Sequence, residues 1–152
     1  MEEIIKLAKK YDLYVIEDNA QAIGCNYKFS NGNNKKTGTI GDIGTTSFFP
    51  SKNLGCYGDG GAIFTNNEEL FLKMKMIANH GQNKKYYHKL TGCNSRLDSI
   101  QAAILNIKLK YLDDYNLNRL KMADTYDLAF NEIEELITPF RSLNSNHVFH
   151  QY

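Results

Sequence analysis

The sequence has no excess of charge, no paired cysteines and no long apolar run, and each absence excludes a class of protein. The 18 basic and 17 acidic residues leave a net charge of +1, so neither a nucleic acid nor an anionic membrane is an expected partner. The three cysteines, Cys25, Cys56 and Cys93, form no Cys-x-x-Cys pair, which argues against a disulfide framework or a zinc ribbon. No apolar stretch reaches the length of a membrane span, and the acidic N-terminus is unlike a signal peptide. We therefore expect a soluble, cytoplasmic protein.

Two kinds of ligand site also lack their sequence patterns. His80 and His88 have no carboxylate or third ligand at a suitable spacing, so structural hydrogen bonding explains them better and no metal site is predicted. A nicotinamide-binding domain needs a glycine fingerprint directly after its first strand, whereas Ile16 is followed by Glu17 and Asp18. With 152 residues, of which 42% are hydrophobic, the chain can bury one domain-sized core.

The most informative stretch runs from Thr45 to Gly61. A β-prone run ends at Phe49, and Pro50 cannot continue a central strand, so the sequence predicts that Lys52 lies on a turn. A glycine-dense segment follows, and then residues 62–65 form a second apolar run that predicts a returning strand. Such a loop is typical of a site where the backbone approaches a ligand closely.

Lys52 is the candidate reactive group of this loop. An average lysine is a solvated surface cation, and that interpretation is the alternative here. The neighbours of Lys52 are largely apolar or aromatic, among them Phe48, Phe49 and Tyr57. Because removal from water favours a neutral, nucleophilic amine, the surroundings favour Schiff-base chemistry.

The N-terminal part predicts half of an α/β unit. Residues 2–11 have the spacing of an amphipathic helix, and Leu13–Ile16 is a continuous apolar run, which predicts a strand buried on both faces. Asp18 follows at the carboxyl end of that strand, where open parallel sheets place their ligands, although a strand terminator or helix cap is the alternative. The Gly- and Asn-rich residues 23–44 predict an exposed hairpin or loop.

The C-terminal half predicts helices. Asn66 or Asn67 can cap a helix that ends before Gly81. Asp98 and Gln101 have the spacing of a capping box that opens a long helix extending to about residue 130. Its expected buried stripe consists of Ile100, Ala103, Ile104, Ile107 and Leu112. Weak helix formers at residues 116–124 predict a break there, and residues 142–152 predict the beginning of a strand.

Three motifs resemble the DegT/StrS-type sugar aminotransferases, which are fold-type I enzymes dependent on pyridoxal phosphate. The first is Ser-Phe-Phe-Pro-Ser-Lys-Asn-Leu-Gly, residues 47–55, followed by Gly-Asp-Gly-Gly-Ala at 58–62. The second is Glu-Asp-x-Ala-Gln at 17–21, and the third is Gly-x-Asn-x-Arg-x-Asp at 92–98. They occur in the family order, and the resemblance covers nearly the whole chain.

The resemblance implies a role for each matching residue. Lys52 would hold pyridoxal phosphate as a Schiff base, and Asp18 would pair with its ring nitrogen, which keeps that nitrogen protonated. Ser47 would bind the phosphate, and Gln21 would lie near the phenolic oxygen. Asn94 would reach the phosphate across a dimer interface. The remaining residue, Arg96, would bind the carboxylate of the amino donor, a task that suits its planar fork.

The resemblance also implies the fold and the reaction. We expect an α/β fold with a mainly parallel sheet flanked by helices, as in a partial PLP-dependent transferase large domain, followed by a long helix. Residues 1–135 would belong to the cofactor-binding domain, and 136–152 would begin a truncated small domain. The expected reaction transfers an amino group, from glutamate, to a nucleotide-linked keto-sugar in a homodimer with shared sites. The alternative is an inactive remnant or an assembly module that binds no cofactor alone.

Overall fold

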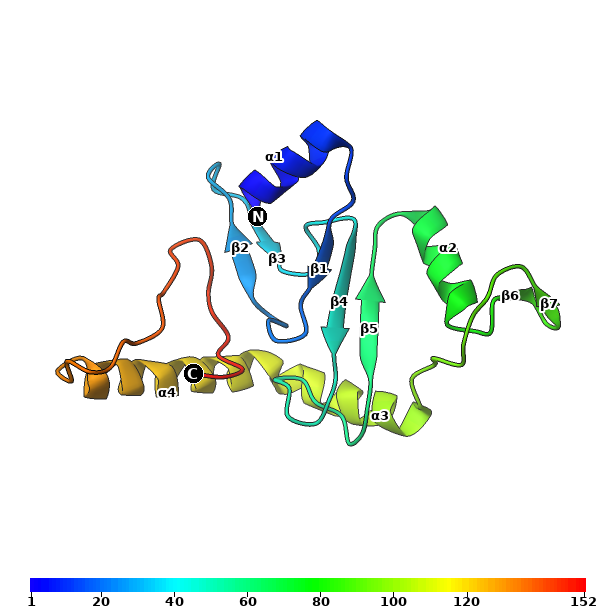
Figure 1. Ribbon diagram of the computed structural model, residues 1–152. Helices are drawn as coiled ribbons and strands as arrows, with labels where there is room; N and C mark the ends of the chain where they lie inside the picture. Colours follow the sequence, from blue (N-terminus) through cyan, green and yellow to red (C-terminus); the bar gives the residue numbers. More distant parts are fainter.

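The computed structural model describes all residues, 1–152, around a three-stranded sheet. The strands are arranged in the order β1-β4-β5 and comprise Ile16–Asp18, Ile43–Ser47 and Gly61–Phe64 (Figure 1). β1 and β4 run parallel, with Asp18 beside Thr45, whereas β5 returns antiparallel, with Gly61 opposite Ser47. The predicted α/β class is confirmed, and the sheet is mixed, because one strand pair is parallel and the other antiparallel.

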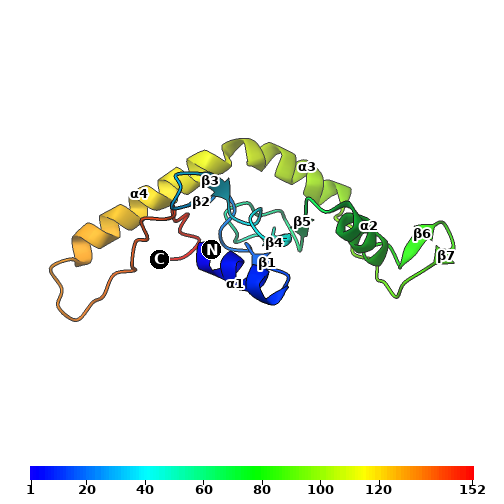
Figure 2. The same ribbon diagram turned by 90° about the horizontal axis from the view of Figure 1, so that it is seen from above.

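Helices lie on both sides of this sheet. Seen from above, the α3 and α4 helices arch along one side and α1 lies on the other (Figure 2). The helices are α1 Glu2–Tyr11, α2 Glu68–Ile77, α3 Ser99–Lys108 and α4 Leu112–Phe130, with the short 3₁₀ turn η1 Leu109–Tyr111 between the last two. The predicted helix cap is present, since the Asn67 side chain accepts a hydrogen bond from the amide of Leu70 at 3.0 Å. No helix is both long enough and apolar enough to cross a membrane.

Two small antiparallel hairpins complete the regular structure. Asn26–Lys28 (β2) pairs with Asn34–Lys36 (β3), which confirms the hairpin predicted for residues 23–44. Gln82–Lys84 (β6) pairs with Tyr87–His88 (β7).

The core lies between β4, the loop that follows it and the long helices. Its cluster of buried residues consists of Phe48, Leu54, Cys56, Leu105 and Leu112. The predicted stripe on the long helix was largely wrong, because Ile100 and Ile107 are 74% and 63% exposed. The buried face is instead marked by Leu105, Leu112, Asn116 and Ala123.

The helix break lies earlier than predicted. α4 continues without interruption through residues 116–124, and the irregularity is at η1, where Tyr111 has φ −109° and ψ 5°. The poor intrinsic propensity of Asn116 for helix is outweighed because its side chain is buried and hydrogen-bonded on both ends of its amide.

The strand predicted to be buried on both faces is exposed. Leu13, Tyr14 and Ile16 are all more than 60% exposed, because no other part of the chain covers them. β1 and β5 each pair only with β4, so both edges of the sheet are open. The total accessible surface is 11140 Å² for 17.4 kDa, whereas a compact monomer of this mass exposes about 7,900 Å². The chain therefore leaves much apolar surface uncovered.

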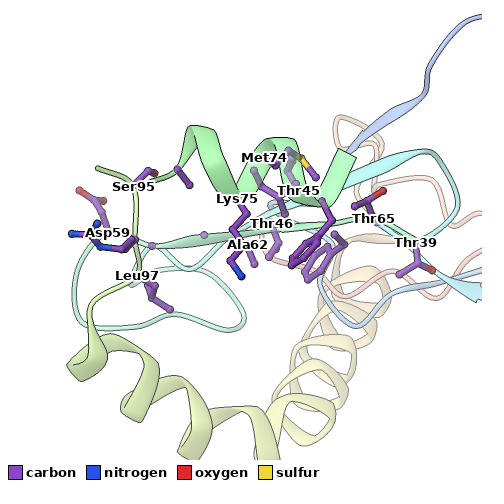
Figure 3. Close-up of a pocket in the computed structure, with 18 of the residues that line it drawn as sticks. Thr39, Thr45, Thr46, Asp59, Ala62, Thr65, Met74, Lys75, Ser95 and Leu97 are labelled. Carbon is purple, nitrogen blue, oxygen red and sulfur yellow. The ribbon is translucent and has the colours of Figure 1, made fainter. Parts of the chain in front are cut away.

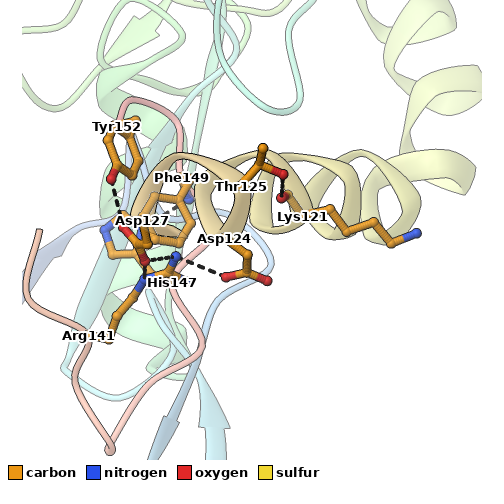
Figure 4. Close-up of polar contacts among 8 residues, drawn as sticks. All are labelled: Lys121, Asp124, Thr125, Asp127, Arg141, His147, Phe149 and Tyr152. Carbon is orange, nitrogen blue, oxygen red and sulfur yellow. Dashed lines mark hydrogen bonds and ion pairs between the residues drawn. The ribbon is translucent and has the colours of Figure 1, made fainter. Parts of the chain in front are cut away.

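The C-terminal residues return to the body of the molecule. A single β-bridge joins Ser145 to Tyr27, and no regular strand forms at residues 142–152. Arg141 pairs with Asp124 and Asp127 on α4, and the hydroxyl of Tyr152 donates to Asp127 at 2.7 Å (Figure 4). These contacts hold the segment against α4.

The Tyr152 and Asp127 contact perturbs both groups. Partial removal from water, together with the hydrogen bond to Asp127, raises the pKa of Tyr152 to about 12. The same hydrogen bond and the neighbouring Arg141 lower the pKa of Asp127.

Candidate functional site

The parallel pair of strands brings the candidate carboxylate and hydroxyl to one edge of the sheet. Both β1 and β4 end at the same edge, with Asp18 closing β1 and Ser47 closing β4. The two segments are also joined by hydrogen bonds beyond the ladder, from the Asn19 amide to the Thr45 carbonyl at 2.9 Å and from the Thr46 hydroxyl to the Asn19 carbonyl at 3.3 Å. The turn that carries Lys52 follows directly after β4.

Glu17 and Asp18 have different surroundings. The Glu17 carboxylate accepts hydrogen bonds from the amides of Gly38, Ile40 and Gly41 at 2.5 to 2.9 Å, so it organises the loop before β4. Successive side chains of a strand point to opposite faces, which directs Asp18 away from that loop. One Asp18 oxygen accepts from the amide of Ala20 at 3.0 Å, and no protein group bonds the other. That oxygen can accept a hydrogen bond from a ligand.

The turn after β4 is tightly bonded to its own backbone. The Ser47 hydroxyl oxygen accepts from the Phe49 amide at 3.2 Å, which leaves its O–H group able to donate. The Lys52 amide donates to the Phe49 carbonyl at 2.9 Å, and Lys52 itself is half-buried. At Gly55 a Cβ would lie 2.4 Å from the carbonyl oxygen of Pro50, so the turn closes only with glycine there.

Polar side chains on α3 bond the backbone of this turn and of the loop that follows it. The Gln101 side chain accepts from the Tyr57 amide at 2.7 Å, and the Lys108 ammonium donates to the Gly55 carbonyl at 2.6 Å. The predicted capping box is therefore wrong, because Gln101 bonds the loop, and Asp98 makes no side-chain cap hydrogen bond.

A histidine that the sequence indicated only as a strand residue lies near the lysine. Burial lowers the pKa of His150, and the positive charges of Lys52 and Arg119 lower it further. The Nδ1 atom of His150 is buried without a hydrogen-bond partner. Arg119 holds the backbone beside it, donating to the carbonyls of Phe149 and His150 at 3.2 and 3.1 Å.

Asn94 and Arg96 lie in a different place from Lys52. They line a cavity of about 1230 Å³ between α2 and the strands β4 and β5 (Figure 3). Asn94 bridges to the backbone of Asn79, and the Arg96 guanidinium donates to the Asn79 side chain at 2.7 Å. This cavity is lined by none of Asp18, Ser47 and Lys52.

The single chain thus brings part of the predicted residue set together. Asp18, Ser47 and Lys52 share one edge of the sheet, and Gln21 lies exposed in the turn directly after Asp18. Asn94 and Arg96 lie apart from that group, along the cavity beside α2.

Comparison with known proteins identifies the family. The family model described as "DegT/DnrJ/EryC1/StrS aminotransferase family" matches residues 1–152. The chain belongs to this family.

Individual relatives agree with the family assignment. The chain is 49% identical to the "Pleiotropic regulatory protein" of Geobacillus stearothermophilus, over 100% of this chain and 40% of the relative. It is 47% identical to the UDP-2-acetamido-2-deoxy-3-oxo-D-glucuronate aminotransferase of Pseudomonas aeruginosa, over 96% of this chain and 39% of the relative. The chain therefore spans about 40% of the length of these curated relatives.

A solved structure confirms the fold of this part of the family. S. venezuelae DesV, crystallised in complex with a ketimine intermediate, matches with a TM-score of 0.89 and 37% identity, over 99% of this chain and 39% of that chain. The fold described above is thus the fold of a partial aminotransferase domain.

Sequence reasoning missed the residues that hold the lysine turn in this family member. The sequence motifs predicted no role in the site for Asn53, Lys108 or Asn116. The only prediction for Asn116 was that it weakens a helix. A signal was present, because Gln101, Lys108 and Asn116 recur at intervals of seven and eight residues, which places polar groups along one helix face.

Proposed function

We propose that the chain carries the cofactor-holding part of a pyridoxal-phosphate-dependent aminotransferase. The supporting observation is that the parallel β1 and β4 strands bring the exposed Asp18 carboxylate, the Ser47 hydroxyl and the Lys52 turn to one sheet edge. An amine, a carboxylate and a hydroxyl donor are the groups that this cofactor's aldehyde, ring nitrogen and phosphate require. The residues present therefore fit the cofactor.

Each residue has a separate task in the proposed reaction. When bound, pyridoxal phosphate supplies an electron sink next to the amino donor's α-carbon. The Lys52 amine would hold the cofactor covalently, and the free amine would accept the proton from that α-carbon. Asp18 would keep a proton on the ring nitrogen, Ser47 would donate to the phosphate, and Gln21 would lie beside the phenolic oxygen.

The substrates follow from the family resemblance and from the relatives. The P. aeruginosa relative is an aminotransferase of a UDP-linked 3-oxo sugar, so the acceptor of this chain would be a nucleotide-linked keto-sugar. Glutamate would be the donor, with its carboxylate bound by the fork of Arg96. Asn94 and Arg96 would act on the site of a second subunit in a homodimer, which agrees with their distance from the Lys52 turn.

The test uses added cofactor and a lysine control. Pyridoxal phosphate should give a visible absorption band with the chain, and borohydride should fix the cofactor on the peptide that contains Lys52. Lys52→Ala should abolish both signals, whereas Lys73→Ala, which changes an exposed lysine on α2, should leave them unchanged. A band that persists in Lys52→Ala would exclude the assigned role of this residue.

A second candidate function has its own supporting observation. The accessible surface exceeds that of a compact monomer by about 3,200 Å², which favours an assembly module that takes part in a larger body and binds no cofactor alone. Absence of any band, together with absence of amino transfer from glutamate, would favour this alternative.

A further inference from the structure

One buried amide side chain on α4 contacts both segments of the candidate site. Asn116 donates through Nδ2 to the carbonyl oxygen of Ile23 at 3.1 Å, on the segment that follows Asp18. Through Oδ1 it accepts from the Nδ2 atom of Asn53 at 2.7 Å, and Asn53 is the residue directly after Lys52. Asn116 therefore links the carboxylate segment to the lysine turn.

The residue that receives this contact is bonded in a second direction. Asn53 uses its other Nδ2 hydrogen on the carbonyl of Val148 at 2.9 Å, and Val148 is only 2% exposed. Asn53 and Asn116 are 7% and 9% exposed, so these hydrogen bonds lie away from water, where loss of a partner is costly. The lysine turn is thus fixed to α4 and to the C-terminal segment at one point.

The buried pair of Asn53 and Asn116 is less favourable in free energy than an apolar pair would be at this place. The Oδ1 atom of Asn53 is buried without a hydrogen-bond partner, and an apolar pair of similar volume would avoid that cost. What the amides add is direction, because a hydrogen bond fixes distance and angle where apolar packing does not. This favours a positioning role over a purely stabilising one.

Two more side chains, on α3, form hydrogen bonds with the loop that carries Lys52. Gln101 and Lys108 hold the backbone of Tyr57 and Gly55, and Asn116 holds the side chain of Asn53. In Figure 1 the loop between β4 and β5 crosses α3. Of the three, Asn116 alone also bonds the segment after Asp18.

We infer that Asn116 is a positioning residue that sets the place of the Lys52 amine relative to Asp18. The inference rests on the proposed function, since the spacing between amine and carboxylate matters only if one cofactor contacts both. The hydrogen bonds of the Asn116 side chain all go to the protein itself. Asn116 acts through Asn53 and through the Ile23 carbonyl.

The first test needs no cofactor. Hydrogen exchange followed by mass spectrometry on the whole chain reports the amides of Lys52 and Cys56, which bond the carbonyls of Phe49 and Phe48. Asn116→Ala should raise their exchange rates about tenfold, as expected when a buried hydrogen bond is lost. Asn106→Ala, at an exposed position of α3 without side-chain bonds, should change them less than twofold. Equal rates in the two variants would overturn the inference.

A second variant separates the two ends of the amide. Asn116→Asp keeps an oxygen for Asn53 but places a carboxylate oxygen against the Ile23 carbonyl. Exchange should then rise at the Cys25 amide, which bonds the Ala22 carbonyl, and less at Lys52. The reverse pattern would show that Asn116 does not connect the two segments as inferred.

The third test separates positioning from general loosening. Covalent capture of pyridoxal phosphate by Lys52 depends on where the amine lies, whereas binding of pyridoxamine phosphate, which forms no bond with lysine, does not. Asn116→Ala should lower capture about tenfold and pyridoxamine phosphate binding less than twofold. Leu112→Ala, which removes core packing on the same helix face, should lower both in equal proportion. Equal loss in Asn116→Ala would refute the positioning role.

The outcomes also distinguish this inference from the proposed function. If the wild-type chain captures no pyridoxal phosphate, the proposed function fails. The exchange measurements then still decide whether Asn116 holds the lysine turn.

Discussion

Replacement of Gly24 by alanine should disrupt the Asn116 contacts from the opposite side. Gly24 has φ +88°, and an added Cβ would lie 2.5 Å from the Nδ2 atom of Asn116, closer than such contacts normally come. The nitrogen concerned is the one that donates to the Ile23 carbonyl. The new methyl group would displace this buried amide from the hydrogen bond.

The magnitude follows from two separate costs. A left-handed backbone conformation costs an alanine about 1–2 kcal/mol, partly offset by about 0.4–1 kcal/mol because alanine has fewer unfolded conformations than glycine. Displacement of a buried amide from its partner adds about 1–3 kcal/mol. Gly24→Ala should therefore lower the free energy of unfolding by about 1–5 kcal/mol.

Gly32 provides a matched control. Its φ is +85°, and an added Cβ would meet nothing within 4 Å, so Gly32→Ala carries the backbone cost alone. Urea denaturation of both variants, followed by circular dichroism, should show Gly24→Ala to be less stable than Gly32→Ala by about 1–3 kcal/mol. Equal destabilisation would refute the claim that the amide of Asn116 is held in place.

Three further predictions concern titratable and reactive groups. Cys93 is exposed and Cys56 is fully buried, and burial raises the pKa of the Cys25 thiol, so an alkylating reagent followed by mass spectrometry should label Cys93 first and the others only on unfolding. Burial lowers the pKa of His147 and of His150 below 6.5. In the pH range just below 6.5 the unfolded chain therefore binds more protons than the folded chain does. The free energy of unfolding should therefore fall as the pH is lowered through this range. The fall should be smaller after both histidines are changed to Gln. Urea denaturation at several pH values measures both effects. Asp127→Asn should lower the pKa of Tyr152 from about 12 towards its ordinary value in an ultraviolet absorbance titration, and an unchanged value would contradict the assigned contact.

Local sequence signals predicted the elements whose causes are local. The helix Glu2–Tyr11 has the predicted bounds, Asn67 caps α2, and the Gly- and Asn-rich stretch forms the β2 and β3 hairpin. These features depend on residues within a few positions of one another. The buried strand at Leu13–Ile16 was predicted wrongly, since its burial requires partners that no part of this chain provides.

The candidate site was predictable as far as its residues lie within motifs. The motifs indicated Asp18, Ser47 and Lys52, and the parallel strand pair brings them to one edge. Asn53 and Asn116 lie 63 positions apart in the chain, and no pattern in either segment indicates that they meet. Gln101 was misassigned for a related reason, because its spacing from Asp98 predicts a local cap and its true partner is the distant Tyr57.

The outer strands affect how copies of the chain meet one another. Each has a row of backbone groups without partners, and apolar side chains such as Ile16 and Ile63 lie beside these rows. The two margins differ in sequence and in strand direction, so a copy that adds its β1 margin to the β5 margin of a neighbour leaves the opposite margins available. Such head-to-tail addition does not close on itself. At high concentration, association through these two margins would therefore give open-ended fibres, unlike the closed homodimer proposed from the positions of Asn94 and Arg96.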